Sequence, residues 1–257
     1  MIVLGFDTAT PATAVGLLLA DGATLQARDD PRPGERPGHA TRLLPLADAL
    51  LAQASLDWGA LERIAVGVGP GTFTGLRIGV ATARGLAQSL GVELVGVSTL
   101  RALAEGVWAG ASKEGVDASV GEADAATRNW ADAASGWDTV VAAIDARRGE
   151  VFAGAYAPGR EVVAPRALVP DALASMLKGS ALAVGDGAVR FRSHLEELGV
   201  AVPENSSPLH RVSGACICEL ACSGEGALDA SPASFAAVVP DYLRRPDAEI
   251  ALEAAAS

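Results

Sequence analysis

The chain has 257 residues, half of them apolar, which is enough to bury one large hydrophobic core or two modest ones. Its 31 acidic residues outnumber its 20 basic ones, and the resulting net charge of −11 argues against a stand-alone nucleic-acid-binding protein. No apolar run reaches the length of a membrane span, and no basic leader precedes the first hydrophobic segment, so we expect a cytoplasmic protein.

The N-terminal segment has the pattern of an antiparallel meander. An apolar strand at 2–6 ends at Asp7, a second strand follows at 14–19, and the Asp21-Gly22 turn allows 24–27 to pair back. Asp7 and the hydroxyls of Thr8 and Thr10 have the chemistry to hold a metal-bound phosphate. The same residues are also ordinary turn formers, so both interpretations stay open.

Two helices are expected after this meander. The first follows a polar loop at 29–38, is marked by Leu43, Leu46 and Leu50, and should be kinked or delayed by Pro45. The second, at 74–90, follows a strand at 64–68 and a glycine-proline-glycine turn at 69–71.

The helix at 74–90 has two different faces. Arg77 and Arg84 share the polar face. The opposite face is small and apolar, and is formed by Gly75, Leu76, Gly79, Val80, Ala83 and Leu86. A glycine inside a helix costs roughly 1 kcal/mol relative to alanine, so this face predicts a close backbone approach. The pattern does not decide between the chain's own sheet and a helix of a partner.

The second half of the chain repeats the first. After a strand at 93–97 and a short helix, an acidic segment at 108–137 has no clear periodicity and predicts a flexible insertion. A strand at 140–144 then ends at Asp145, and a second strand follows at 151–157. This copy of the N-terminal unit predicts a duplicated α/β fold with two similar lobes, at 1–107 and 138–212.

The remaining segments carry weaker signals. The turn from Gly185 to Gly187 is typical of a plain strand-to-helix connection, and only secondarily of a phosphate-binding loop. An apolar helix at 213–223 holds all three cysteines and should contain reduced thiols, because an odd, clustered set makes a poor disulfide framework. This helix is a candidate to pack back on the first lobe, ahead of a tail at 224–257.

Six motifs, in order along the chain, resemble the TsaB (YeaZ) family of bacterial tRNA threonylcarbamoyladenosine (t6A) biosynthesis. They are GFDTAT at 5–10, HATRLLP at 39–45, GVGPGTFTGLRIGVATARGLA at 67–87, GVSTL at 96–100, AIDARRGEVF at 143–152 and PDYLR at 240–244. The glycine-proline-glycine stretch followed by FTGLRIG is the most specific of them. The resemblance implies a duplicated ribonuclease-H-like fold of the actin-like ATPase superfamily, with mixed sheets flanked by helices.

The resemblance also implies a partner. Members of this family pair with the catalytic paralogue TsaD through two helices of the first lobe, and the ATPase TsaE completes the assembly. The paired enzyme modifies N6 of adenosine 37 in tRNAs that read codons beginning with A. The chain would then reach tRNA only through the complex, would form a homodimer when alone, and would use as its interface Leu43, Leu46, Leu50, Gly75, Leu76, Gly79, Val80, Ala83 and Leu86.

The same comparison predicts a chain without catalytic residues, metal or cofactor. TsaD-like paralogues bind their metal with two histidines four residues apart, and those positions hold Thr99 and Leu103 here. Neither side chain replaces an imidazole ligand. The alternative is an actin-like kinase or ATPase that binds nucleotide between the lobes, using Asp7, Thr8, Thr10, Asp145 and the turn from Gly185 to Gly187. A metalloprotease is the weakest hypothesis, because the chain lacks the metal ligands that such an enzyme needs.

Overall fold

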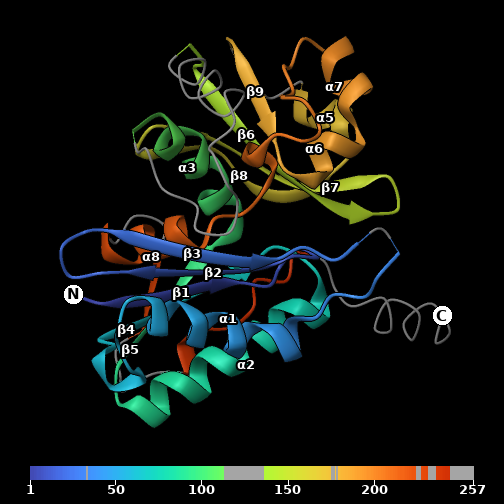
Figure 1. The fold of residues 1–257 in the computed structure, drawn as a ribbon. Helices are drawn as coiled ribbons and strands as arrows, with labels where there is room; N and C mark the ends of the chain where they lie inside the picture. The colour runs from blue at the N-terminus through green and yellow to red at the C-terminus, as the bar shows by residue number, and fades with distance from the viewer. Residues whose placement is uncertain are drawn as a thin grey trace, which may run out of the picture.

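The computed structural model describes residues 1–32, 34–112, 136–174, 177, 179–223, 227–230 and 236–243. It has two lobes, each built on one β-sheet, with helices between the two sheets and on both outer sides (Figure 1). None of the helices in the described ranges is long and apolar enough to cross a membrane.

The first lobe contains a six-stranded mixed sheet in the order β10-β5-β4-β1-β2-β3. The antiparallel meander is formed by β1 (Val3–Asp7), β2 (Thr13–Leu18) and β3 (Thr24–Asp29). On the other side of β1 lie the parallel strands β4 (Arg63–Gly69) and β5 (Glu93–Ser98). The edge strand β10 (Ala227–Ala230) returns from the C-terminal part of the chain and pairs antiparallel with β5.

The second lobe repeats this arrangement in a four-stranded sheet of order β8-β7-β6-β9. Its meander is formed by β6 (Thr139–Arg147), β7 (Glu150–Ala157) and β8 (Arg160–Leu168), and β9 (Ala181–Val184) runs parallel to β6. In both sheets the first strand of a meander pairs with a later parallel strand. The predicted duplicated α/β fold with two lobes is therefore confirmed.

Helices α1 (His39–Gln53) and α2 (Phe73–Leu90) cover the outer face of the first sheet (Figure 1). The short 3₁₀ helix η1 (Trp58–Ala60) links α1 to β4. Between the sheets lie α3 (Thr99–Ser112) and α8 (Gly214–Ser223), whose apolar side chains join one core with both sheets. The second sheet's outer face packs on α5 (Pro170–Ala174), α6 (Asp186–Arg190) and α7 (Arg192–Glu197), after which the 3₁₀ helix η2 (Pro208–His210) leads to α8.

The helix that carries the cysteines packs on the first lobe through a glycine contact. A Cβ atom at Gly16 of β2 would lie 2.2 Å from the carbonyl carbon of Gly214, so only glycine permits this approach. The Cys218 thiol, fully buried, contacts the carbonyl oxygens of Val3 and Gly16 at 3.5 and 3.4 Å. Burial raises the pKa of Cys218, so its thiol stays protonated at neutral pH.

Several boundaries differ from the expectations. Pro45 lies inside α1, which begins at His39, so the proline does not delay the helix. Strand β8 was not expected, because its charged residues and Pro165 are poor strand signals, but an edge strand tolerates both. Helix α3 extends to Ser112 and takes up the start of the expected insertion, whose residues 113–135 lie outside the described ranges.

The contact between Gly16 and Gly214 gives a stability prediction. Gly16→Ala should lower the free energy of unfolding by roughly 2 kcal/mol, because the added methyl group forces α8 away from the sheet. A change of that size corresponds to a loss of about 4–8 °C in Tm for a domain of this length. Thermal denaturation followed by circular dichroism measures it.

The matched control for this prediction is Gly106→Ala on α3, where a Cβ atom would meet nothing within 4 Å. Because alanine has a higher helix propensity than glycine, this variant should have the same Tm as the wild type or a higher one. Equal Tm values for Gly16→Ala and the wild type would contradict the close-packing argument.

Candidate functional site

Asp7 lies at the C-terminal end of β1, and its carboxyl group is enclosed by its own lobe. The side chain is 1% exposed. Its Oδ1 accepts from the backbone N–H of Ala9 at 2.8 Å, and its Oδ2 accepts from the Thr99 hydroxyl at 2.6 Å. Because burial is the dominant influence, the pKa of Asp7 is raised above its usual value.

The Asp7 carboxyl group is closely covered by β4 and by the start of α3. A Cβ atom at Gly67 of β4 would lie 1.8 Å from Asp7 Oδ2, which shows how closely this strand covers the carboxyl group. The Thr99 hydroxyl that donates to Asp7 also accepts from the backbone N–H of Gly69 at 3.1 Å. Through Thr99, the hydrogen bonds of Asp7 therefore hold β1, the end of β4 and the start of α3 together.

The other proposed nucleotide-binding residues do not join Asp7 in one site. Thr8 is fully buried and donates from its hydroxyl to the carbonyl oxygen of Gly75 at 2.8 Å, whereas Thr10 is half-buried. Asp145 belongs to the second sheet, where its carboxylate accepts from Arg190 at 2.8 Å and lies 3.2 Å from Arg147. Among the described residues, no hydrogen bond or ion pair links Asp7 with Asp145.

Asp186 binds the backbone of Asp145 in the second lobe. Its Oδ1 accepts from the backbone N–H of Asp145 at 3.0 Å, and burial raises the pKa of Asp186. At the adjacent turn, a Cβ atom on Gly187 would lie 2.9 Å from the Ala143 backbone, so the turn packs on its own strand. This contact agrees with a plain strand-to-helix connection.

The two positions that the family resemblance assigned to absent metal ligands make structural contacts here. Thr99 is the first residue of α3, and its hydroxyl donates to Asp7. Leu103 is 1% exposed and lies in the core between the sheets. Within the described ranges, no three His, Cys, Asp or Glu side chains are grouped closely enough to hold a metal ion.

The small face of α2 packs on its own lobe. A Cβ atom at Gly75 would lie 1.9 Å from the carbonyl oxygen of Thr8, and one at Gly79 would lie 2.3 Å from the Thr8 hydroxyl. The two glycines therefore allow α2 to approach the turn between β1 and β2. Of the two interpretations of this face, packing on the chain's own sheet explains both glycines.

Most of the nine residues expected at a dimer interface form the core under α1 and α2. Only Leu46 and Leu86 are partly exposed, and the others are buried: Leu43, Leu50, Gly75, Leu76, Gly79, Val80 and Ala83. The outer face consists of different residues. It exposes 43% of Leu44 and 36% of Phe73, and it includes Ala81 and also Gly85, where a Cβ atom would meet nothing within 4 Å.

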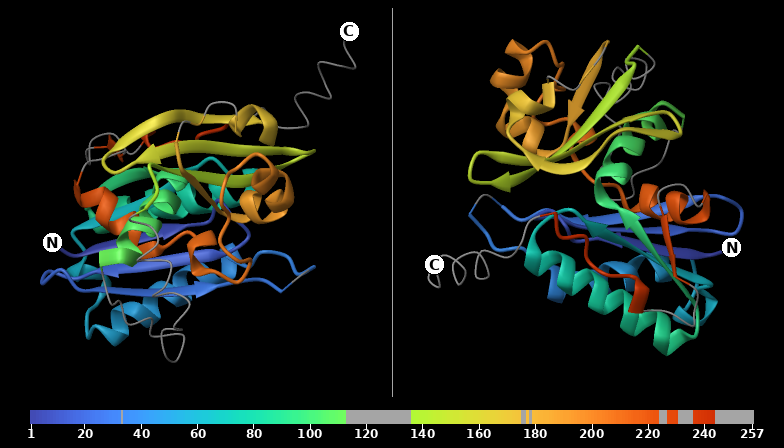
Figure 2. Two further views of the ribbon diagram at one scale, coloured as in Figure 1. Left: turned by 90° about the horizontal axis from the view of Figure 1, so that it is seen from above. Right: turned by 180° about the vertical axis from the view of Figure 1, so that it is seen from behind.

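A C-terminal segment at 236–243 lies beside α2, as the view from behind shows (Figure 2). Arg84 Nη2 donates to the carbonyl oxygens of Ala236 and Val238 at 3.0 and 2.5 Å, and the Val238 side chain is fully buried in the core. The backbone N–H of Asp241 donates to the carbonyl oxygen of Val68 at 2.7 Å. We call residues 236–243 the C-terminal strap.

Arg77 joins the strap to the first turn of α2. Its guanidinium lies 3.8 Å from the centre of the Phe73 ring, and its Nε donates to the Tyr242 hydroxyl at 3.2 Å. The Phe73 and Tyr242 rings are 5.2 Å apart. The polar face of α2 thus contacts a segment of its own chain, which spacing within the helix could not reveal.

The chain is similar to several known proteins in sequence and in fold. The family model described as TsaD, tRNA N6-adenosine threonylcarbamoyltransferase, matches residues 35–118. An uncharacterized protein of Mycobacterium tuberculosis is 33% identical over 254 residues, covering 96% of this chain and 93% of its own length. The TsaB protein of Escherichia coli is 36% identical over 156 residues, which cover 61% of this chain and 55% of that protein.

Two further relatives match over nearly the whole chain. The TsaB protein of Bacillus subtilis is 28% identical, with 97% of this chain and 96% of that protein covered. The solved structure of YeaZ from Pseudomonas aeruginosa has a TM-score of 0.66 and 28% identity, and the match covers 94% of this chain and 100% of that one. The chain therefore belongs to the TsaB (YeaZ) family.

Proposed function

We propose that this chain acts in t6A biosynthesis as a non-catalytic subunit that pairs with a TsaD-type threonylcarbamoyltransferase. Relatives named as t6A biosynthesis proteins, one of them matched along almost its full length, support the pathway. The observation that carries the non-catalytic part is the enclosed carboxyl group of Asp7, which is tied to Thr99 where the catalytic paralogue has a metal ligand.

The same observation weighs against the alternative of a kinase or ATPase. An enzyme of that kind needs a strand-end carboxylate that can reach a metal-bound phosphate. Asp7 instead has both oxygens occupied by protein donors, and Gly67 closes over it. Asp145 is similarly held by arginines of its own lobe.

The outer faces of α1 and α2 form the pairing surface in this proposal. Leu44 and Phe73 supply exposed apolar groups, while Ala81 and Gly85 let a partner helix approach the backbone of α2. Leu46 and Leu86 reach the partner from the side, and the buried residues of the expected interface support the two helices from below. The same surface serves a homodimer when the partner is absent.

The other members of the assembly follow from the family. A TsaE-type ATPase completes the complex in the cytoplasm, and this chain reaches tRNA only through the complex. The net charge of −11 agrees with this division, because a protein of that charge repels a phosphate backbone on average.

A reconstitution tests the proposed role. Mixtures of a TsaD-type protein, a TsaE-type protein, preformed threonylcarbamoyl adenylate and tRNA should form t6A only when this chain is added. Mass spectrometry of nucleosides measures the product. Full modification without the chain, or modification by the chain alone, would refute an accessory role.

Gly85 tests the pairing surface. Gly85→Trp places a large side chain on the outer face, so the monomer should keep its fold while its affinity for the TsaD-type protein falls at least about tenfold, or about 1.4 kcal/mol. Sedimentation velocity and calorimetry measure the two effects. Changes at Gly75 or Gly79 would not be diagnostic, because they disturb the contact with Thr8.

The control is Gly85→Ala, which improves helix propensity without adding bulk and should stabilise the monomer by up to about 1 kcal/mol. If Gly85→Trp binds the TsaD-type protein as tightly as the wild type does, the outer face of α2 is not the pairing surface.

Asp7→Asn tests the structural role of the carboxyl group. The amide can still accept from Ala9 and can donate to Thr99, so t6A formation in the reconstituted mixture should be retained. Because the pKa of Asp7 is raised from its ordinary value of 3.8, its contribution to stability is fully present below that value and declines as pH increases. The variant's free energy of unfolding should therefore rise relative to wild type between pH 3 and pH 7.

Urea unfolding across that pH range measures the difference. A variant whose free energy of unfolding falls relative to wild type with increasing pH would contradict the assigned role. Turnover of ATP by the isolated wild-type chain, abolished in Asp7→Asn, would instead favour the kinase or ATPase alternative.

A further inference from the structure

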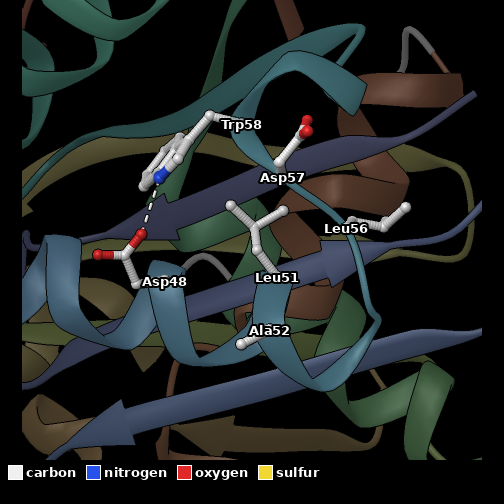
Figure 3. Close-up of a pocket in the computed structure, with 6 residues that line it drawn as sticks. All are labelled: Asp48, Leu51, Ala52, Leu56, Asp57 and Trp58. Carbon is white, nitrogen blue, oxygen red and sulfur yellow. Dashed lines mark hydrogen bonds between the residues drawn. The ribbon is translucent and has the colours of Figure 1, made fainter.

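A pocket of about 350 Å³ opens at the C-terminal end of α1, next to η1 (Figure 3). It belongs to none of the sites described above. Six residues line it: Asp48, Leu51, Ala52, Leu56, Asp57 and Trp58. It therefore combines two carboxylates, one indole ring and an apolar lining in a small volume.

The end of α1 gives the pocket its shape. Ser55 has a left-handed conformation with φ of 56°, so the chain turns back at this residue. The backbone N–H of Leu56 donates to the carbonyl oxygen of Leu51 at 2.9 Å, and that of Ser55 donates to Ala52 at 3.0 Å. This arrangement sets Leu56 beside the last turn of the helix, where Leu51 is 2% exposed.

The indole of Trp58 is held in place by Asp48. Its Nε1 donates to Asp48 Oδ1 at 2.7 Å, the dashed line in Figure 3. The Trp58 side chain remains half-buried, so part of the ring is accessible from the pocket. An accessible indole face attracts cations through its π-electrons.

The pocket is electronegative. Asp48 and Asp57 are exposed, and neither forms an ion pair with any residue in the described ranges. The last turn of α1 has no basic residue, although the C-terminal end of a helix carries partial negative charge. Asp48 and the C-terminal end of α1 therefore bring negative potential to the indole, whereas the Asp57 carboxylate lies at the start of η1 and points away from Asp48 (Figure 3).

We propose that this pocket binds an arginine side chain of the protein that pairs with α1 and α2. A guanidinium group can stack on the Trp58 ring and bind the Asp48 carboxylate, while its alkyl stem packs on Ala52 and Leu56. This inference rests on the proposed function. It adds a specific anchor at one end of the pairing surface.

The position of the pocket favours a protein partner as the source of the cation. Leu44, Asp48 and Ala52 are exposed at four-residue spacing on α1, so the pocket continues the outer stripe of that helix. A partner helix that lies along this stripe brings its own side chains to the pocket. Charge complementarity then selects a basic one.

The pocket can be tested by itself with a small probe. The indole N–H signal of Trp58 in a ¹H–¹⁵N spectrum, assigned with Trp58→Phe, should shift saturably with N-acetyl-arginine amide. N-acetyl-citrulline amide, which has the same shape without the charge, should shift it much less. Asp48→Asn combined with Asp57→Asn should abolish the difference, while the amide oxygen introduced at position 48 can still accept from the indole. Equal shifts with both probes, or none, would overturn the proposal.

Binding to the partner tests the source of the arginine. The same double variant should bind the TsaD-type protein about tenfold more weakly at low salt, and the difference should shrink at high salt. The control is Asp21→Asn with Glu197→Gln, which removes two exposed charges elsewhere and should bind like the wild type.

The outcomes separate the two proposals. If the complex forms and the double variant binds as tightly as the control, the pocket proposal is wrong and the proposed function stands. If the wild-type chain forms no complex with the TsaD-type protein, the proposed function fails and the partner named here fails with it. The probe titration then decides only whether the pocket binds guanidinium.

Discussion

The enclosed carboxyl group of Asp7 is the contact on which the first lobe depends. Its two oxygens accept from Ala9 and Thr99, so the turn after β1 and the start of α3 are held at one point. The hydroxyl of the neighbouring Thr8 donates to the carbonyl oxygen of Gly75. This hydrogen bond holds the start of α2 against the loop that follows β1. In an open site, an aspartate at this position could serve phosphate chemistry. Here Asp7 and Thr8 instead join β1, the end of β4, α2 and α3.

The position of α2 follows from these contacts. Because Gly75 and Gly79 let its inner face approach Thr8, the helix lies close to the sheet and presents a separate outer face. The C-terminal strap then contacts one side of that face through Arg77 and Arg84. The pairing surface that we propose is thus assembled from α1, α2 and a segment far away in the sequence, with the acidic pocket at one end.

The sequence was sufficient to predict the duplicated fold, because alternation, turn residues and the repeat of an aspartate after a strand are local signals. It could not separate the inner from the outer face of α2, since glycines at one-turn spacing are compatible with either neighbour. It also could not reveal that Thr99 binds Asp7, or that Arg77 binds Tyr242, because each pair is brought together only by the tertiary fold. Strand β8 was missed because an edge position removes the usual objection to proline.

The most direct test of the pairing surface is hydroxyl-radical footprinting of the chain with and without a TsaD-type protein, read by mass spectrometry at single side chains. Leu44, Phe73 and Tyr242 should lose reactivity in the complex, because they lie on or beside the outer faces of α1 and α2. Val162, Val169 and Leu198 are similarly exposed on the second lobe and should keep theirs. Protection of the second-lobe residues, with Leu44 and Phe73 unchanged, would contradict pairing through these helices.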